Sequence, residues 1–260
     1  MQTIDRQAME ECYEEVGFTS RNVSHADCTS LLAGRFAEAL SEARRATGIL
    51  ELLVNGDPEA FAAQLAHSGY ARIHFLKRCA KESFADYHTS ASHSEGLFDA
   101  LAAGQLGIAR EIAALSQKAF RPNEEYEDDF CYAHFLHGYI GPTPPAQGKV
   151  LKQFGKALEG DASARLAICH AFESVDAAAF DQAFDALLDE HDEHVAELRL
   201  GRAEEEVAVA AGTYVFVEGL ALLWLAERAG FDTKADYRYC PALARAAIGS
   251  APPPDELPPV

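Results

Sequence analysis

The stretch "LFDALAAGQLGIAREIAALS", residues 97–116, decides the fold class of this 260-residue chain. Its apolar residues recur every three or four positions, as they do on one face of an α-helix, and Gly104 interrupts the pattern. The stretch therefore predicts two short helices on either side of a turn. The predicted apolar faces are formed by Phe98 and Leu101 in the first helix and by Ile108, Ile112 and Leu115 in the second.

The same helical pattern continues on both sides of this stretch, and strand-like alternation is nearly absent. Asp57-Pro58-Glu59 predicts a helix start, with Asp57 as the cap, for a helix that runs to about Glu82. Helices joined by short loops predict an all-α fold, a bundle of packed antiparallel helix pairs with about ten helices. The other predicted helices cover residues 30–48, a segment starting in 124–129, and residues 149–158, 162–173, 176–198, 203–211, 213–229 and 241–248.

Proline and glycine mark the predicted boundaries. "GPTPPAQG", residues 141–148, has three prolines and two glycines, so it is the candidate break between two sub-bundles of one domain over residues 1–249. "SAPPPDELPPV" at the end has five prolines in eleven residues. We therefore expect residues 250–260 to form a disordered tail.

Charge is the unusual property of the composition. Twenty-two Lys and Arg stand against 41 Asp and Glu, a net charge of −19. Nucleic acids and anionic membranes would repel such a chain, whereas a basic protein would be attracted to it. The most apolar window, residues 207–226, is as long as a membrane span, but Glu218 lies within it beside Gly212 and Gly219, so we expect buried core helices.

Cysteines and the N-terminus indicate the compartment. The six cysteines form no CxxC pair, which predicts reduced, buried thiols. The first residues carry acids where a signal peptide needs a basic start followed by an apolar run. Together these features predict a cytoplasmic protein.

Catalytic and metal-binding motifs are not evident. His134 with His137, and His191 with His194, have the i, i+3 spacing of a shared helix face, but no Glu precedes either pair at the offset that di-iron bundles need. No HExxH, GxSxG or glycine-rich phosphate loop occurs. We therefore predict no catalytic residue, no cofactor and no metal.

One acidic surface is predicted on the helix over residues 176–198. Between Arg165 and Arg199 there is no Lys or Arg but there are nine acids, five of them at successive i+4 positions. Unrelieved like charges at this spacing cost a helix about 0.2–0.5 kcal/mol per pair, which favours a docking role. A merely solvated acidic face is the alternative. The acidic ridge is formed by Asp181, Asp185, Asp189, Glu193 and Glu197, with Glu190 and Asp192 beside it.

A second acidic cluster lies in "EEYEDDF", residues 124–130. Tyr126 and Phe130 are spaced as on one buried face, so Asp128 or Asp129 is also a candidate for a half-buried carboxylate that pairs with an arginine of a neighbouring helix. A docking role and a structural role both remain open. The docking candidates here are Glu124, Glu125, Glu127 and Asp128.

Four segments resemble one known family: "LFDALAAGQLGIAREIAALS", "EYEDDFCYAHFLHGYI", "VEGLALLWLAERAGF" and "CPALA". In this order, over residues 95–245, the chain resembles the immunity protein 49 family of bacterial polymorphic toxin systems. The resemblance implies an all-α, non-enzymatic antitoxin that stays in the cytoplasm and binds a cognate toxin domain. With the charge, it favours a basic toxin, for example a nuclease. The alternatives are an α-helical scaffold or adaptor, and a carboxylate/His metalloenzyme.

Overall fold

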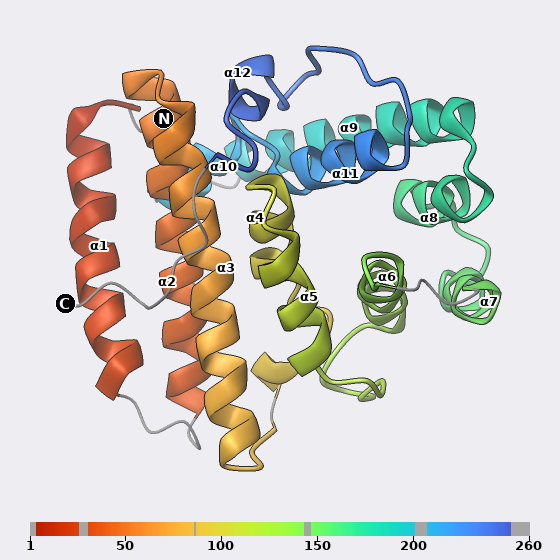
Figure 1. The fold of residues 1–260 in the computed structure, drawn as a ribbon, viewed down its shortest axis with the longest axis horizontal. Coiled ribbons are helices and arrows are strands. Elements are labelled where there is room, and N and C mark those ends of the chain that lie inside the picture. The colour runs from red at the N-terminus through yellow and green to blue at the C-terminus, as the bar shows by residue number, and fades with distance from the viewer. Residues whose placement is uncertain (1–3, 26–30, 86, 143–146, 201–206, 251–260) are drawn as a thin grey trace.

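The computed structural model describes residues 4–25, 31–85, 87–142, 147–200 and 207–250, which form an arrangement of packed helices (Figure 1). Ten α-helices are seven residues or longer, and the described residues contain no strand. The predicted all-α fold with about ten helices is confirmed. The predicted tail lies outside the described residues, apart from Ser250.

Three long helices form one side of the molecule (Figure 1). α2 lies between the other two in packing, because both α1 and α3 contact it extensively. These helices are α1 (Arg6–His25), α2 (Leu31–Leu50) and α3 (Pro58–Lys81).

The connection between α2 and α3 follows local rules. α2 passes into a π-helical turn, Glu51–Asn55, and the chain then reverses at Gly56, whose φ of 66° favours glycine. The side chain of Asp57 next accepts hydrogen bonds from the first backbone N–H groups of α3. The predicted helix start at Asp57-Pro58 is confirmed.

The stretch 97–116 forms the predicted pair of helices in the middle of the molecule. α4 (Glu95–Ala102) and α5 (Leu106–Leu115) are joined at Gly104, which has a φ of 73°. A short 3-10 turn, Tyr87–Thr89, precedes them. α4 packs against α3 on one side and α11 on the other, so this pair connects the two halves of the fold.

The remaining helices are α6 (Glu127–Tyr139), α7 (Gly148–Ala157), α8 (Ala164–Ser174), α9 (Ala177–Leu200), α10 (Val207–Gly212), α11 (Val217–Arg228) and α12 (Ala242–Arg245). Of these, α6, α7, α8, α9 and α11 form the other side, whereas α10 packs against α2 and α12 against α3 (Figure 1). The core of this other side is aromatic: the ring of Phe172 lies 4.8 Å from that of Tyr139, 5.3 Å from that of Phe180 and 6.0 Å from that of Phe231.

One hydrophobic cluster extends from Ala8 in α1 to Ala244 in α12, on both sides of the proline-rich segment 141–148. Residues 143–146 of that segment lie outside the described residues. The boundary between two sub-bundles therefore stays a prediction.

Two local expectations are corrected by the structure. Tyr126 is 78% exposed, whereas we expected it on a buried face. α6 begins only at Glu127, and Tyr126 is the extended residue that caps it. Its carbonyl still accepts from the backbone N–H of Phe130 at 3.0 Å, but its side chain lies outside the helix face. The helix expected over 213–229 begins later, at Val217, because Phe216 is still extended.

One described stretch, Val207–Arg228, is long and apolar enough to cross a membrane, by length and composition alone. In the structure, residues 213–216 divide it into α10 and α11, and 61% of its most apolar window is buried inside the protein. Core helices pass the same test, so this stretch is weak evidence for a membrane span. Its burial agrees with the predicted core helices.

Candidate functional site

A polar groove surrounds Glu95, the first residue of α4. Glu95 lines four adjacent hollows, the largest of them about 690 Å³ in volume. Three of these hollows are also lined by Asp129, and together we call them the Glu95 groove. Residues of α2, α4, α6, α8, α9 and α11 line it. Seven acids line this groove: Glu95, Glu124, Glu125, Asp128, Asp129, Glu190 and Glu218. Among the described residues, only two arginines, Arg45 and Arg165, line it with them.

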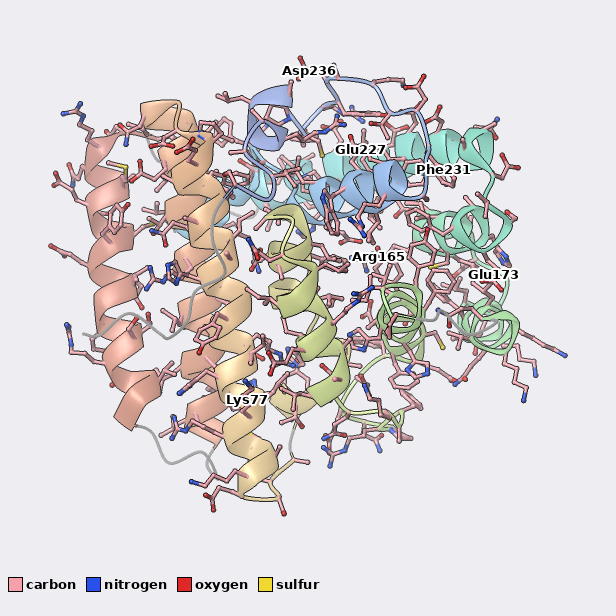
Figure 2. All side chains as sticks on the ribbon, in the orientation of Figure 1. Lys77, Arg165, Glu173, Glu227, Phe231 and Asp236 are labelled. Atoms are coloured by element: carbon pink, nitrogen blue, oxygen red, sulfur yellow. The ribbon has the colours of Figure 1, made fainter. Side chains whose placement is uncertain are left out.

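Arg165 is held by acids from two neighbouring helices. From the first turn of α8 it points between α4 and α6 (Figure 2). Its Nε and Nη2 donate to the two carboxylate oxygens of Glu218 at 2.9 and 2.7 Å, and its Nη1 lies 3.3 Å from Oδ1 of Asp129. The hydroxyl of Tyr132 also donates to Glu218, at 2.9 Å. This network fixes α6, α8 and α11 to each other at the floor of the groove.

Arg45 is held in the same way on the other side. Its Nε and Nη2 donate to both oxygens of Asp99 at 2.6 and 2.8 Å, and Ser68 also donates to this carboxylate. Burial alone would lower the pKa of Arg45, but the carboxylate of Asp99 raises it above its usual value. The positive charge of Arg45 is therefore already matched by a fully buried partner from α4.

Two carboxylates of the groove have no such partner. No described residue forms a hydrogen bond or ion pair with Glu95 or Asp128, which are exposed and half-buried, respectively. Each lies in the first turn of its helix, where the helix dipole stabilises a negative charge. Burial raises the pKa of their neighbour Asp129, and Asp128, Glu218 and Glu95 add to this rise against the opposing effect of Arg165. The groove therefore holds more negative charge than its own arginines balance.

The structure divides the predicted docking residues between the groove and α9, except for Glu127 of α6, which lies in neither place. Glu124, Glu125, Asp128 and Glu190 line the Glu95 groove. The other acids of the ridge line none of its three hollows and lie on α9.

Residues 124–129 have structural contacts as well. Glu125 accepts a hydrogen bond from the hydroxyl of Ser92 at 2.8 Å, and Glu127 accepts one from Gln153 at 2.8 Å. Asp129 is half-buried and pairs with Arg165 of α8. The candidate carboxylate–arginine pair with a neighbouring helix is confirmed.

The sequence suggested that no basic residue offsets the charge of the acidic ridge, but the structure shows that two do. Basic residues of the segment between α11 and α12 fold against it: Lys234 lies 3.6 Å from Asp185, and Arg238 lies 2.5 Å from Asp189 and 3.3 Å from Asp192. The pattern within α9 could not show this, because the partners come from about 50 residues further along the chain. Asp181, Glu193 and Glu197 keep no ion-pair partner among the described residues.

The two predicted histidine pairs show no metal-binding arrangement among the described residues. The ring of His134 stacks on Phe130 at 5.4 Å, and His137 is buried without a hydrogen-bond partner for either ring nitrogen. The ring of His191 stacks on Phe216 at 4.1 Å. Burial lowers the pKa of His137 to about 3 and that of His191 to about 4. His137 and His191 therefore pack as neutral rings.

Sequence reasoning missed Glu95, Arg45 and Arg165 as parts of one site. Two signals were visible in the sequence: Glu218, as an acid inside the most apolar window of the chain, and Asp129, as a candidate partner for an arginine. The two salt bridges that frame the groove join residues 53 and 54 positions apart, a separation that no local pattern reports.

A family model described as Immunity protein 49 matches residues 80–244, well over half of the chain. The chain belongs to the immunity protein 49 family. Immunity proteins of this kind bind and inhibit cognate toxins and are not enzymes, which removes the metalloenzyme alternative. The match includes the parts of α4, α6, α8, α9 and α11 that line the groove, whereas α2 with Arg45 lies outside it. No curated protein and no solved structure matches the chain.

Proposed function

We propose that this immunity protein neutralises one cognate toxin by binding a basic segment of it in the Glu95 groove. The observation that carries the proposal is the charge of the groove, in which seven acids face two arginines. Both arginines are already engaged, Arg165 by Glu218 and Arg45 by Asp99.

A lysine or arginine of the toxin would find free acceptors here. Glu95 and Asp128 have no partner among the described residues and lie in a hollow, where charge pairs are less screened than on a flat surface. The acidic ridge of α9 borders the groove through Glu190, so its field would add to the attraction at a distance. In this proposal the Glu95 groove contacts the toxin, and the acidic ridge speeds its association by attracting it at a distance.

The charge also favours a particular class of toxin. A nuclease needs a basic cleft for phosphates, and an acidic helical surface with a chain charge of −19 can occupy such a cleft in place of the nucleic-acid backbone. We place the protein in the cytoplasm; the five described cysteines are free and buried, which supports a reducing compartment.

Two variants with the same change of charge test where the toxin binds. Glu95→Lys with Asp128→Lys changes the groove, and Glu193→Lys with Glu197→Lys changes the ridge. Each protein is used as bait in host lysate at low and high salt, and the captured partner is identified by mass spectrometry and titrated. We expect the wild type to retain one basic toxin domain that is released as salt rises.

The groove variant should lose at least about a hundredfold in affinity, as two like-charge contacts at an interface would produce. The ridge variant should lose less, mainly in association rate. Equal affinity and equal salt dependence for the wild type and the groove variant would exclude the groove. A larger loss in the ridge variant would move the contact to α9.

A further inference from the structure

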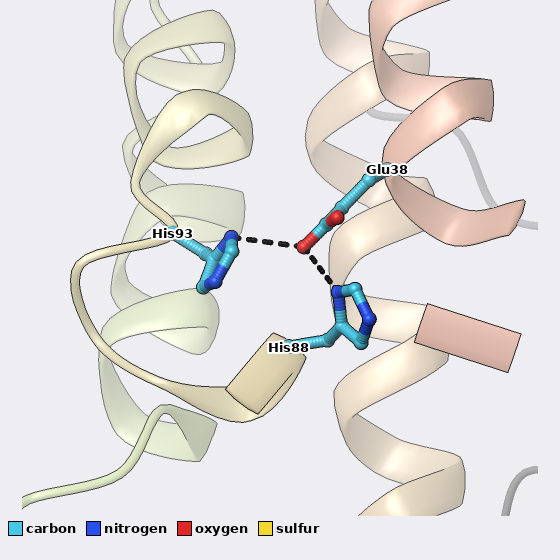
Figure 3. Close-up of side chains that lie close together, drawn as sticks. All are labelled: Glu38, His88 and His93. Atoms are coloured by element: carbon cyan, nitrogen blue, oxygen red, sulfur yellow. Dashed lines mark hydrogen bonds and ion pairs between the residues drawn. The ribbon is translucent and has the colours of Figure 1, made fainter. Parts of the chain in front are cut away.

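Three side chains of types that can bind a metal ion lie close together beside the groove (Figure 3). Glu38 comes from α2, His88 from the 3-10 turn and His93 from the segment just before α4. Oε1 of Glu38 lies 2.8 Å from Nδ1 of His88 and 2.8 Å from Nδ1 of His93. The carboxylate is 36% exposed, and the two histidine side chains are 7% and 13% exposed.

The segment that carries the two histidines is firmly held. Buried Arg72 of α3 donates to the backbone carbonyls of His88 and Ser90. Gln117 donates to the hydroxyl of Thr89 at 2.6 Å. These contacts fix the backbone around both imidazoles, as a preformed site requires.

Space for the His88 ring is provided by a glycine. A Cβ atom placed on Gly34 of α2 would lie 2.3 Å from Cγ of His88, far closer than any real contact. The imidazole therefore lies directly on the backbone of α2, four residues before Glu38. Only glycine at this position lets the ring come so close to the carboxylate.

The ligand set has a defined chemistry. Two imidazole nitrogens and one carboxylate oxygen suit divalent transition metals such as Zn²⁺, and three protein ligands leave positions open for water or a further ligand. Glu38 and His93 also line a cavity of about 340 Å³, which Glu42 and Glu95 line as well. Arg45 and Arg72 line the cavity too, but Arg45 is paired with Asp99 and Arg72 donates to backbone carbonyls. An ion can enter from this cavity, where the carboxylates attract it.

We propose that Glu38, His88 and His93 bind one divalent transition-metal ion. Ligand atoms around tetrahedral Zn²⁺ are about 3.3 Å apart. The present 2.8 Å separations therefore need to open by about half an ångström, within the reach of side-chain rotation. Each imidazole then coordinates through Nδ1 and carries its proton on Nε2.

Bound metal would tie α2 to the 87–94 segment, which forms one wall of the Glu95 groove. Ser92 of this segment donates to Glu125 of the acidic cluster at 2.8 Å. The ion would thus make this wall of the groove more rigid. The inference does not depend on the toxin, because binding is measured on the chain alone.

The rival interpretation is a metal-free network in which both Nδ1–H groups donate to Glu38. Calorimetric titration of chelator-treated protein with Zn²⁺ separates the two. We expect one ion per chain with micromolar or tighter affinity, and with Co²⁺ a visible absorption spectrum typical of nitrogen and oxygen ligands. Absence of binding at submillimolar Zn²⁺ would overturn the proposal. A sulfur-to-cobalt charge-transfer band would overturn it too, because it would place the ion on a cysteine.

Variants locate the ion. Glu38→Gln and His93→Ala should each weaken Zn²⁺ binding by at least about tenfold. Gly34→Ala removes no ligand but displaces the His88 ring, so it should weaken binding as well. His170→Ala, at an exposed histidine of α8, is the matched control and should bind like the wild type. Circular dichroism checks folding, and unchanged affinity in folded Glu38→Gln and His93→Ala would refute the assignment.

Discussion

Removing the carboxylate of Glu218 should destabilise the protein more than any surface acid would. Glu218 is 10% exposed and accepts two hydrogen bonds from Arg165 and one from Tyr132. In Glu218→Ala the hydroxyl of buried Tyr132 loses its hydrogen-bond partner. Arg165 keeps its 3.3 Å contact with Asp129 and its position over the ring of Tyr132, but no close bidentate partner. Breaking a buried pair costs about 3–5 kcal/mol, whereas exposed pairs contribute at most about 1 kcal/mol.

We expect a loss of about 3 kcal/mol, at the low end of that range, because Arg165 is 38% exposed and can turn toward water. For a chain of this size the loss corresponds to a fall of about 6–12 °C in Tm. Urea unfolding followed by circular dichroism measures it. Glu193→Ala, on the exposed face of α9, is the control and should stay within about 0.5 kcal/mol of the wild type. A loss under about 1 kcal/mol in Glu218→Ala would show that the network does not fasten α8 and α11.

Three further outcomes can be measured in the same way. The pKa of His137 is about 3 in the folded state, below its unfolded value, so its contribution to stability is complete above pH 6.5 and falls as pH drops toward 3. His137→Leu should therefore reduce the stability difference between about pH 7.5 and 5 by about 2 kcal/mol, and an unchanged difference would refute this. Gly104→Ala should cost about 2 kcal/mol, because the residue has a φ of 73° and its new Cβ would lie 2.7 Å from the backbone nitrogen of Gly249; unchanged urea unfolding would refute this. Arg238→Ala removes the base that pairs with Asp189 and Asp192. Because these pairs are exposed, the free energy of unfolding should change by less than about 1 kcal/mol. Toxin association should become faster at low salt, and an unchanged association rate would show that the ridge does not attract the toxin at a distance.

Local patterns in the sequence predicted most of the helices, although α1 was not among them. Asp57 caps α3 and Gly104 separates α4 from α5, because capping and a left-handed backbone depend on neighbours within a few residues. The buried face of α9, with Phe180 and Phe184, also follows from spacing alone. Tyr126 shows the limit: a one-residue difference in where α6 begins moved it from the expected core to solvent.

The charged site depended on long-range contacts. The sequence identified the acidic segments 124–129 and 181–197, since a run of like charges is visible without a fold. It could not show that Arg238 neutralises part of the second one. Nor could it show that Glu38 meets His88 and His93, because Glu38 and His88 lie 50 positions apart in the chain.

By itself, the sequence determined that this protein is all-helical, acidic and similar to the immunity protein 49 family, because helix periodicity, charge and family motifs are properties of short segments. Only the tertiary structure decided which acids stay unpaired. Glu95 and Asp128 face a shared groove because helix packing carried Arg45 and Arg165 to other carboxylates. Pairing energies fall steeply with distance and burial, and both quantities exist only once the helices have packed.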